Sequence, residues 1–568
     1  MKIFFWSMLW ISILFSSCDR QSGNKKKQVV QDSQKIPVCG IPDLADKEWY
    51  ASGKKALMFK GLGGINFAIT TKNTEAQKYF NQGLMLAFGF NHAEAARSFF
   101  EATRQDSTSA MCWWGFAYVL GPNYNAGMVA GNFQRANDAV KKAKSYAASC
   151  TKKERDLIEA LTHRYSSDTT IARSVLDSSY AAAMRSVYTK YGDDANVASL
   201  YAESLLDLHP WNLWRKDGTA QPWTPEIIGV LEKCLQKEPK HVGANHFYIH
   251  AMEASQHPEN SLASANLLRD LVPGSGHLVH MPSHTYIRTG RYHDGVETNL
   301  KAILADSLYT ETCYAQGMYP SAYYPHNYHF IAACATLGGE SRAAIKAAQD
   351  IISHTSKKLL MDKAWTSFQS YYSIKWYVAV KLGQWNQILN ATTDKELKYP
   401  TAIWHYAQGM ANLSQGKTTV AKKHLGEMQT LLADSALKTM PSWKECLIAR
   451  KTLEGEISAK EKNYPKAILL LKEAATDEDS LNYAEPPEWP FSVRQNLGAV
   501  LLESRNYNEA IRIYEEDLKS YPENGWALRG LMNAYDRLGD KNKYERAKSR
   551  FKKAWKHADL EISASRIL

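Results

Sequence analysis

The chain has 568 residues, of which 45% are hydrophobic and 22% are charged, a composition typical of folded globular proteins. This balance excludes a chain that is disordered throughout and a protein that is mostly embedded in a membrane. The 69 Lys and Arg residues outnumber the 58 Asp and Glu residues, but the excess is spread along the chain and no nucleic-acid-binding motif accompanies it. We therefore expect no nucleic-acid partner.

The N-terminus is typical of a bacterial lipoprotein signal peptide over residues 1–17. An early lysine is followed by an apolar run, residues 3–15, that is too short to span a bilayer. The following FSSC, with Cys18, resembles the lipobox, in which the cysteine is diacylated and becomes the new first residue. The match departs from that motif at Phe15, where the lipobox prefers Leu. A plain cleavable signal is the alternative.

Residues 18–40 are expected to be the lipidated Cys18 and a disordered polar tether, and residues 41–74 a lead-in to the folded body. This organisation predicts an exported protein that is lipid-anchored to a bacterial cell-envelope membrane, at its periplasmic face or at the cell surface. The cysteines after Cys18 are scattered and form no CxxC pair, which argues against a zinc ribbon or a thioredoxin-like site.

From residue 75 onward, Ala-rich amphipathic segments alternate with short turns that contain Gly, such as RTGRY and TLGGES. Small residues recur with a step of twelve, as in Gly83 and Ala95, and unit ends recur with a step of 34, as in Pro239 and Pro273. The small residues are expected where two helices cross closely, and the prolines where the second helix of a unit ends. The pattern predicts an all-α chain of antiparallel helix pairs.

This 34-residue unit resembles the tetratricopeptide repeat (TPR) family over roughly residues 75–555. The resemblance implies a TPR-type helical-hairpin solenoid, wound as a right-handed superhelix, whose first helices line a concave groove for a protein or peptide partner. We expect N-terminal TPR-like repeats over 75–345 and C-terminal TPR repeats over 346–568. HLVHMPSHTYIRTGRY, YYPHNYHF and EPPEWPFSVRQNLGAVLL also resemble a bacterial TPR-containing lipoprotein family, which implies a fold but no activity.

Histidines concentrate in residues 241–329, which hold ten of the 17 in the chain. The 34-residue frame makes His246 equivalent to His280, and His250 equivalent to His284, on successive first helices. Steps of three and four residues bring side chains to one helix face, so these four imidazoles are expected to point into one groove. At its edge we expect four further candidates: Glu253, His277, His326 and His329.

Such a cluster predicts a divalent transition metal, zinc, copper or iron, because neutral imidazole is a strong ligand for these ions and a carboxylate adds an oxygen donor. Seven histidines exceed the needs of one tetrahedral ion, which favours a dinuclear site or one ion with further imidazoles around it. The site is catalytic or sequestering, and the sequence assigns no reaction and no substrate. Three alternatives stay open: a metal-free scaffold for a protein or peptide partner, a glycan-binding lipoprotein, and inert packing histidines.

Three aromatic-rich segments interrupt the repeats near this cluster. Residues 207–223 contain three tryptophans, and residues 121–128 and 317–327 are rich in Gly, Asn and Tyr. The first segment is expected to form either a wall over the groove or a buried hairpin cap. The tyrosines of the other two are able to stack on a sugar or peptide.

Overall fold

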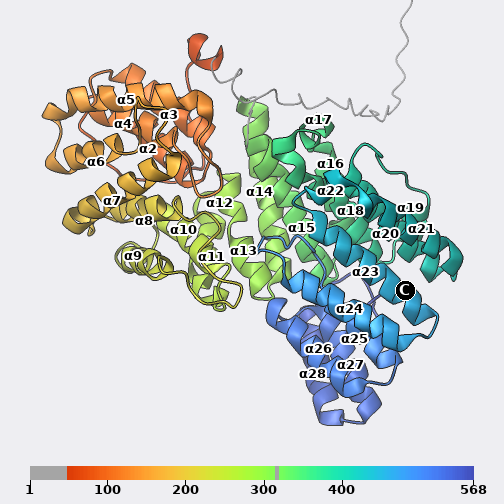
Figure 1. Ribbon diagram of the computed structural model, residues 1–568. Coiled ribbons are helices and arrows are strands. Elements are labelled where there is room, and N and C mark those ends of the chain that lie inside the picture. Colours follow the sequence, from red (N-terminus) through yellow and green to blue (C-terminus); the bar gives the residue numbers. More distant parts are fainter. Residues whose placement is uncertain (1–47, 314–318) are drawn as a thin grey trace, which may run out of the picture. The chain divides into compact units, whose positions relative to one another are not determined.

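The computed structural model describes residues 48–313 and 319–568 (Figure 1). The predicted signal peptide, Cys18 and the tether lie outside these ranges. The described residues contain helices and no strand, and their two isolated bridges pair Asn123 with Ala126 and Trp214 with Ala220. The predicted all-α class is confirmed.

The helices follow one another in antiparallel pairs. In the N-terminal half these are α2 (Thr74–Phe88), α3 (His92–Gln105), α4 (Ala110–Val119), α5 (Phe133–Tyr146), α6 (Lys152–Thr162), α7 (Arg173–Tyr191), α8 (Ala195–Leu206), α9 (Thr224–Lys237), α10 (Val242–Met252), α11 (Leu262–Leu271), α12 (Gly276–His280), α13 (Pro282–Arg288) and α14 (Tyr292–Cys313). Short 3-10 turns join some of them: η1 (Ala130–Asn132), η2 (Ala147–Ser149) and η3 (Pro258–Ser261).

The C-terminal half continues the same arrangement. Its helices are α15 (Tyr324–Gly338), α16 (Ser341–Ser353), α17 (Lys357–Leu360), α18 (Gln369–Lys381), α19 (Trp385–Leu389), α20 (Lys398–Ser414), α21 (Thr418–Ala433), α22 (Ser435–Lys438), α23 (Trp443–Lys460), α24 (Tyr464–Asp479), α25 (Arg494–Glu503), α26 (Tyr507–Ser520), α27 (Gly525–Leu538) and α28 (Lys541–Ala554). A π turn, η4 (Tyr319–Tyr323), precedes α15, and a 3-10 turn, η5 (Lys363–Phe368), precedes α18.

Small residues lie where paired helices cross, as the step of twelve predicts. Helix α2 packs on α3, and a Cβ added at Gly83 would lie only 2.8 Å from the Phe99 ring. Pro239 and Pro273 each follow a helix end by two residues, after α9 and α11. The structure is therefore a helical-hairpin solenoid of the TPR type.

One helix is broken where the sequence pattern suggested continuity. The segment that carries His280 and His284 forms two short helices, α12 and α13, which meet at Met281. Pro282 causes the break, because it has no N–H to continue the hydrogen-bond ladder and its ring clashes with the preceding turn.

The apolar core is divided into two clusters that adjoin within α13. Tyr286 belongs to the cluster formed mainly by residues 56–286, and the next residue, Ile287, belongs to the cluster that continues to Ile562. The histidine-bearing helices thus lie where the two cores meet. All described residues belong to one compact unit.

The C-terminal repeats also contact helices far from them in sequence. Trp526 on α27 donates to the carbonyl of Thr336 on α15 at 2.9 Å, and the Tyr292 hydroxyl of α14 donates to the carbonyl of Pro522 at 2.8 Å. The guanidinium of Arg288 lies over the Tyr483 ring, 5.7 Å from its centroid. A simple row of repeats, in which each unit touches only its neighbours, does not make such contacts.

The described cysteines are free thiols, and five of these six are buried. Within residues 48–313 and 319–568, no helix combines the length and the apolarity that crossing a membrane requires.

Candidate metal centre

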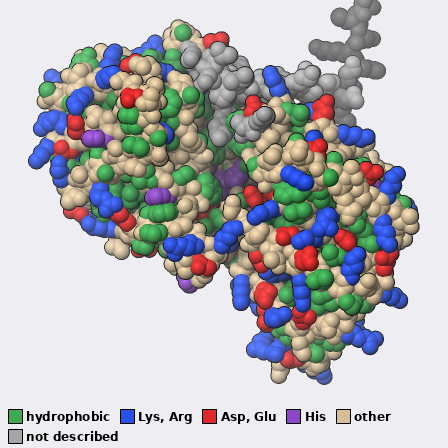
Figure 2. All heavy atoms as spheres, in the orientation of Figure 1, with side chains coloured by type: hydrophobic (Ala, Val, Ile, Leu, Met, Phe, Trp, Pro, Cys, Tyr) green, Lys and Arg blue, Asp and Glu red, His purple; other side chains and the backbone are tan. Residues whose placement is uncertain are grey.

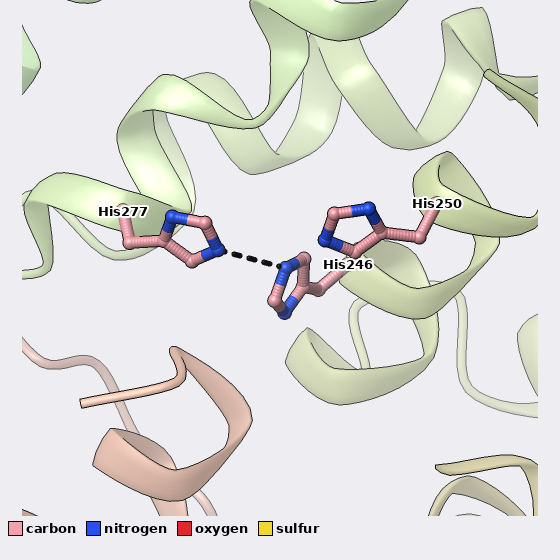
Figure 3. Close-up of side chains that lie close together, drawn as sticks. All are labelled: His246, His250 and His277. Carbon is pink, nitrogen blue, oxygen red and sulfur yellow. Dashed lines mark hydrogen bonds between the residues drawn. The ribbon is translucent and has the colours of Figure 1, made fainter. Parts of the chain in front are cut away.

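Six histidines gather into two groups of three. Within each group, one ring nitrogen per residue lies within 4.8 Å of those of the other two. The first triad consists of His246 and His250 from α10 and His277 from α12 (Figure 3). The second triad consists of His280 from α12, His284 from α13 and His326 from α15. Figure 2 shows histidine atoms at the bottom of a recess in the surface, over α12.

The triads are interior rather than displayed along an open groove. His246 and His280 have 0% of their surface exposed, and His250, His277 and His284 have no more than 2%. Only His326 is partly exposed. Each of the two equivalent histidine pairs belongs to one triad. The third histidine comes from α12 in the first triad and from α15 in the second.

Four of the six imidazoles donate a hydrogen bond from Nδ1 to an acceptor. His246 donates to the carbonyl oxygen of Phe88 at 2.6 Å. His250 and His284 donate to the two carboxylate oxygens of Glu253, at 2.7 and 2.5 Å. A carbonyl and a carboxylate only accept, so the proton of each of these three rings is on Nδ1 and a lone pair is on Nε2.

His280 is also assigned its proton on Nδ1, on the orientation of the Asn299 amide. Its Nδ1 lies 2.7 Å from Oδ1 of Asn299, whose amide nitrogen donates to the carbonyl oxygen of Gly295 at 2.7 Å. That second bond fixes the amide orientation, so Asn299 presents an oxygen to His280. The Nε2 atom of His280 therefore also carries a lone pair.

The Nε2 atoms of these rings are turned toward one another. His280 and His284 bring their Nε2 atoms to 2.9 Å. In the first triad, the Nε2 atoms of His246 and His277 lie 3.2 Å apart (Figure 3). Nδ1 of His277 has no hydrogen-bond partner among the described residues, so neutral His277 can carry its proton on Nε2 and donate it to His246. The Nε2 atom of His250 is buried and has no hydrogen-bond partner in the described part of the chain. A metal ion satisfies such converging lone pairs, and ligating histidines usually donate their other N–H to a carboxylate or carbonyl, as here.

Burial favours the neutral form of four of the imidazoles. It is the largest cause that holds the pKa of His246, His277, His280 and His326 well below the usual 6.5, and neighbouring imidazoles lower these values further. Burial opposes the ionisation of Glu253, but its interactions with His284 and His250 bring its pKa down to about 2. The centre thus has neutral nitrogen donors and one buried carboxylate between the triads.

Each triad lies against one phenylalanine ring. Phe90 lies under the first triad, with ring centroids 4.5 Å from His246, 5.7 Å from His250 and 5.6 Å from His277. Phe330 lies against the second, 4.8 Å from His280, 4.6 Å from His284 and 5.0 Å from His326. These rings exclude water from one side of each group and fix the orientation of the imidazoles.

The three aromatic-rich segments all reach the first triad. Tyr124 lies 5.0 Å from His250, Trp211 lies 5.9 Å from the same ring, and Tyr323 lies 4.8 Å from His277. Residues 207–223 therefore contribute to a wall of the centre.

Two predicted residues lie outside the triads. Glu253 accepts hydrogen bonds from one histidine of each triad and belongs to neither. His329 packs 5.1 Å from Tyr371, and its Nδ1 atom is buried without a hydrogen-bond partner among the described residues. The sequence analysis did not identify Phe88, Asn299 or Tyr371, whose hydroxyl lies 3.2 Å from Nδ1 of His326. Only folding brings them to the histidines, and no local motif marks them.

Fold and site together define an all-α, TPR-type repeat protein with an enclosed histidine centre. A scan against protein-family models gives no match. A search of curated proteins gives no match either.

Solved structures give weak matches that span most of the chain. Human IFIT1 dimer with m7Gppp-AAAA has a TM-score of 0.32 and 14% identity, covering 86% of this chain and 91% of that one. The P58(IPK) TPR domain has a TM-score of 0.21 and 13% identity, covering 86% and 99%. The APC/C hetero-tetramer Cut9-Hcn1 has a TM-score of 0.28 and 14% identity, covering 85% and 90%. Matches at these TM-scores give no information about ligands of this chain.

Proposed function

We propose that this protein binds two transition-metal ions, one in each histidine triad. The tautomers support the proposal most directly. Four Nδ1 atoms donate to fixed acceptors. In the neutral rings this leaves Nε2 lone pairs that face each other between His280 and His284, and one at His250 that has no hydrogen-bond partner among the described residues. Neutral packing alone gains little from such an arrangement, because lone pairs that face one another in a buried site repel.

The donor set narrows the choice of metal. Each triad offers imidazole nitrogens and no thiolate, which suits zinc, copper or iron rather than magnesium or calcium. Three protein ligands leave one position of a tetrahedral ion open, as in zinc sites where a water or a substrate takes the fourth position. The centre is therefore suited to catalysis as well as to metal sequestration.

The test is elemental analysis of the full chain, purified without a His-tag and supplied with zinc, copper, iron and manganese. We expect about two equivalents of one of the first three metals. Less than about a tenth of an equivalent of every metal would overturn the proposal.

We further propose that the protein acts at a bacterial cell-envelope membrane, to which a lipid on Cys18 attaches it. The support is the lipobox-like FSSC sequence after an apolar run of signal-peptide length. A lipid anchor and a tether would hold the metal centre at the membrane surface.

Association with a protein partner, here a second copy of this chain, is the second candidate, and one surface feature favours it. Leu300, Leu304 and Leu308 lie at successive steps of four along α14 and are 52%, 64% and 58% exposed. Such an apolar stripe fits the same stripe of a second copy, related by a two-fold axis. Light scattering after size-exclusion chromatography tests this candidate. This candidate predicts that the wild type is a dimer and that Leu304→Asp converts it to a monomer. A monomeric wild type would contradict the candidate.

A further inference from the structure

Trp211 occupies a strained position in a turn beside the first triad. The N–H of Asn212 donates to the carbonyl oxygen of His209 at 3.1 Å, which closes a turn with Pro210 in second place and Trp211 in third. The φ angle of Trp211 is +58°. A turn with Pro in second place and a positive φ in third place normally carries Gly or Asn there, and a bulky side chain is disfavoured.

The loop does not depend on the Trp211 ring for its attachment. Trp214 donates from Nε1 to the carbonyl oxygen of Ala251 at 2.8 Å, and Trp223 donates to the carbonyl oxygen of Asn212 at 2.9 Å. The Trp211 ring remains 41% exposed. A strained, exposed aromatic residue that the fold does not need points to a role in binding.

The ring connects the protein surface to the first triad. Trp211 stacks on Tyr124, with centroids 5.4 Å apart and an interplanar angle of 28°. Tyr124 is 3% exposed and lies 5.0 Å from His250. The Nε2 atom of His250, buried and without a hydrogen-bond partner among the described residues, belongs to the same ring. Trp211 itself lies 5.9 Å from His250, so an exposed aromatic residue, with the buried Tyr124 beside it, adjoins the position where a metal ion would be held.

Charge adds a second requirement for the ligand. Two divalent ions would place four positive charges in the centre, and the one carboxylate hydrogen-bonded to the triad imidazoles is Glu253. A buried excess of positive charge is costly, so the open coordination position favours an anionic oxygen over a neutral ligand.

Resting on the proposed function, we infer that the first triad binds a phenol, with its ring against Trp211 and its oxygen on the metal ion. A phenol combines a flat ring with a hydroxyl that ionises more easily than that of an aliphatic alcohol. Binding would exchange a hydroxide on the ion for the phenolate, and the phenol proton would leave with that hydroxide as water. Two other ligands each meet one requirement. An aliphatic carboxylate such as acetate has the anionic oxygen but no ring. Benzyl alcohol has the ring but no anionic oxygen at neutral pH.

The full chain is loaded with zinc, checked for metal content and titrated with 4-nitrophenol in a calorimeter. The titration is then repeated with benzyl alcohol and with acetate. We expect 4-nitrophenol to bind most tightly. Trp211→Gly removes the ring and restores the residue that the turn favours, so we expect affinity to fall about tenfold while metal content and unfolding temperature are kept. Trp211→Phe should retain most of the affinity.

Lys462→Gly is the matched control, because Lys462 also has a positive φ, +62°, in a turn between α23 and α24. It should leave 4-nitrophenol binding unchanged. The inference is overturned if the zinc-loaded wild type does not bind 4-nitrophenol, if acetate or benzyl alcohol binds as tightly, or if Trp211→Gly binds like the wild type. A chain that takes up no metal would overturn the proposed function as well, which separates the two failures.

Discussion

His280 and His284 face each other through Nε2 atoms 2.9 Å apart, and Nδ1 of each ring faces an acceptor, Asn299 for His280 and Glu253 for His284. Two lone pairs at this distance need a cation between them. A proton or a metal ion meets this need, and burial disfavours the proton on His280, whose pKa is held well below 6.5. A metal ion bonded to both nitrogens meets the same need and adds His326 as a third ligand.

Removing one ligand should empty one triad and spare the other. His277→Ala should leave about one equivalent of metal, held by the second triad, and His326→Ala should leave about one equivalent in the first. The double variant His250→Ala with His284→Ala should hold none and keep its helicity. Elemental analysis and circular dichroism measure both quantities. His257→Ala is the control, since that side chain is 70% exposed, and it should keep both ions.

Glu253→Gln should weaken metal binding although Glu253 is not among the triad ligands. A glutamine accepts one hydrogen bond and donates another, so one of His250 and His284 must move its proton to Nε2 and lose its ligating lone pair. We expect about 10- to 100-fold weaker binding at one triad, measured by competition with a chelator. Glu259→Gln, at an exposed carboxylate beside His257, is the control. Equal affinity in Glu253→Gln and wild type would contradict this role of Glu253.

The metal-free protein should lose stability as pH falls below about 6.5. In the folded state, burial lowers the pKa of four triad histidines well below 6.5 and that of His329 to about 4. The histidines of the unfolded chain take up protons near 6.5. The free energy of unfolding is therefore highest above that pH. It should fall by about 1.4 kcal/mol per pH unit for each such histidine below it. Thermal unfolding between about pH 7.5 and 5.5 measures the slope, and a flat profile would count against buried neutral imidazoles.

The same lowered pKa values affect metal release. Protons compete with metal for the Nε2 lone pairs, and a lower pKa makes them weaker competitors. We expect the ions to be retained to a pH lower than an exposed imidazole cluster would allow. Dialysis over a pH series followed by elemental analysis measures this, and release above about pH 6.5 would contradict it.

Cys18→Ala should release the protein from the membrane fraction. Without the thiol no lipid is attached, and the remaining apolar segment is too short to span a bilayer. Fractionation of cells that express each form measures the difference. A wild type that is already soluble would reject the lipid anchor and leave only secretion.

Local pattern determined much of the fold. Apolar residues at helical spacing predict helices, and the step of twelve between Gly83 and Ala95 predicts where paired helices cross. Both features depend on short-range geometry, which a sequence displays directly. Pro282 stands in the sequence, but the break that it causes, two short helices instead of one, was not predicted from it.

The sequence by itself determined that histidines gather on neighbouring helices, because a repeat of fixed length places residues 34 apart at equivalent positions. Only the tertiary structure decided how they are used. It divided six of them between two triads, placed Glu253 between these, and brought Asn299 and the Phe88 carbonyl to their Nδ1 atoms. These partners come from helices whose approach depends on packing across the whole chain. That packing decides which acceptor each Nδ1 atom faces, and thereby where the Nε2 lone pairs point. The spacing of residues in the sequence does not show this.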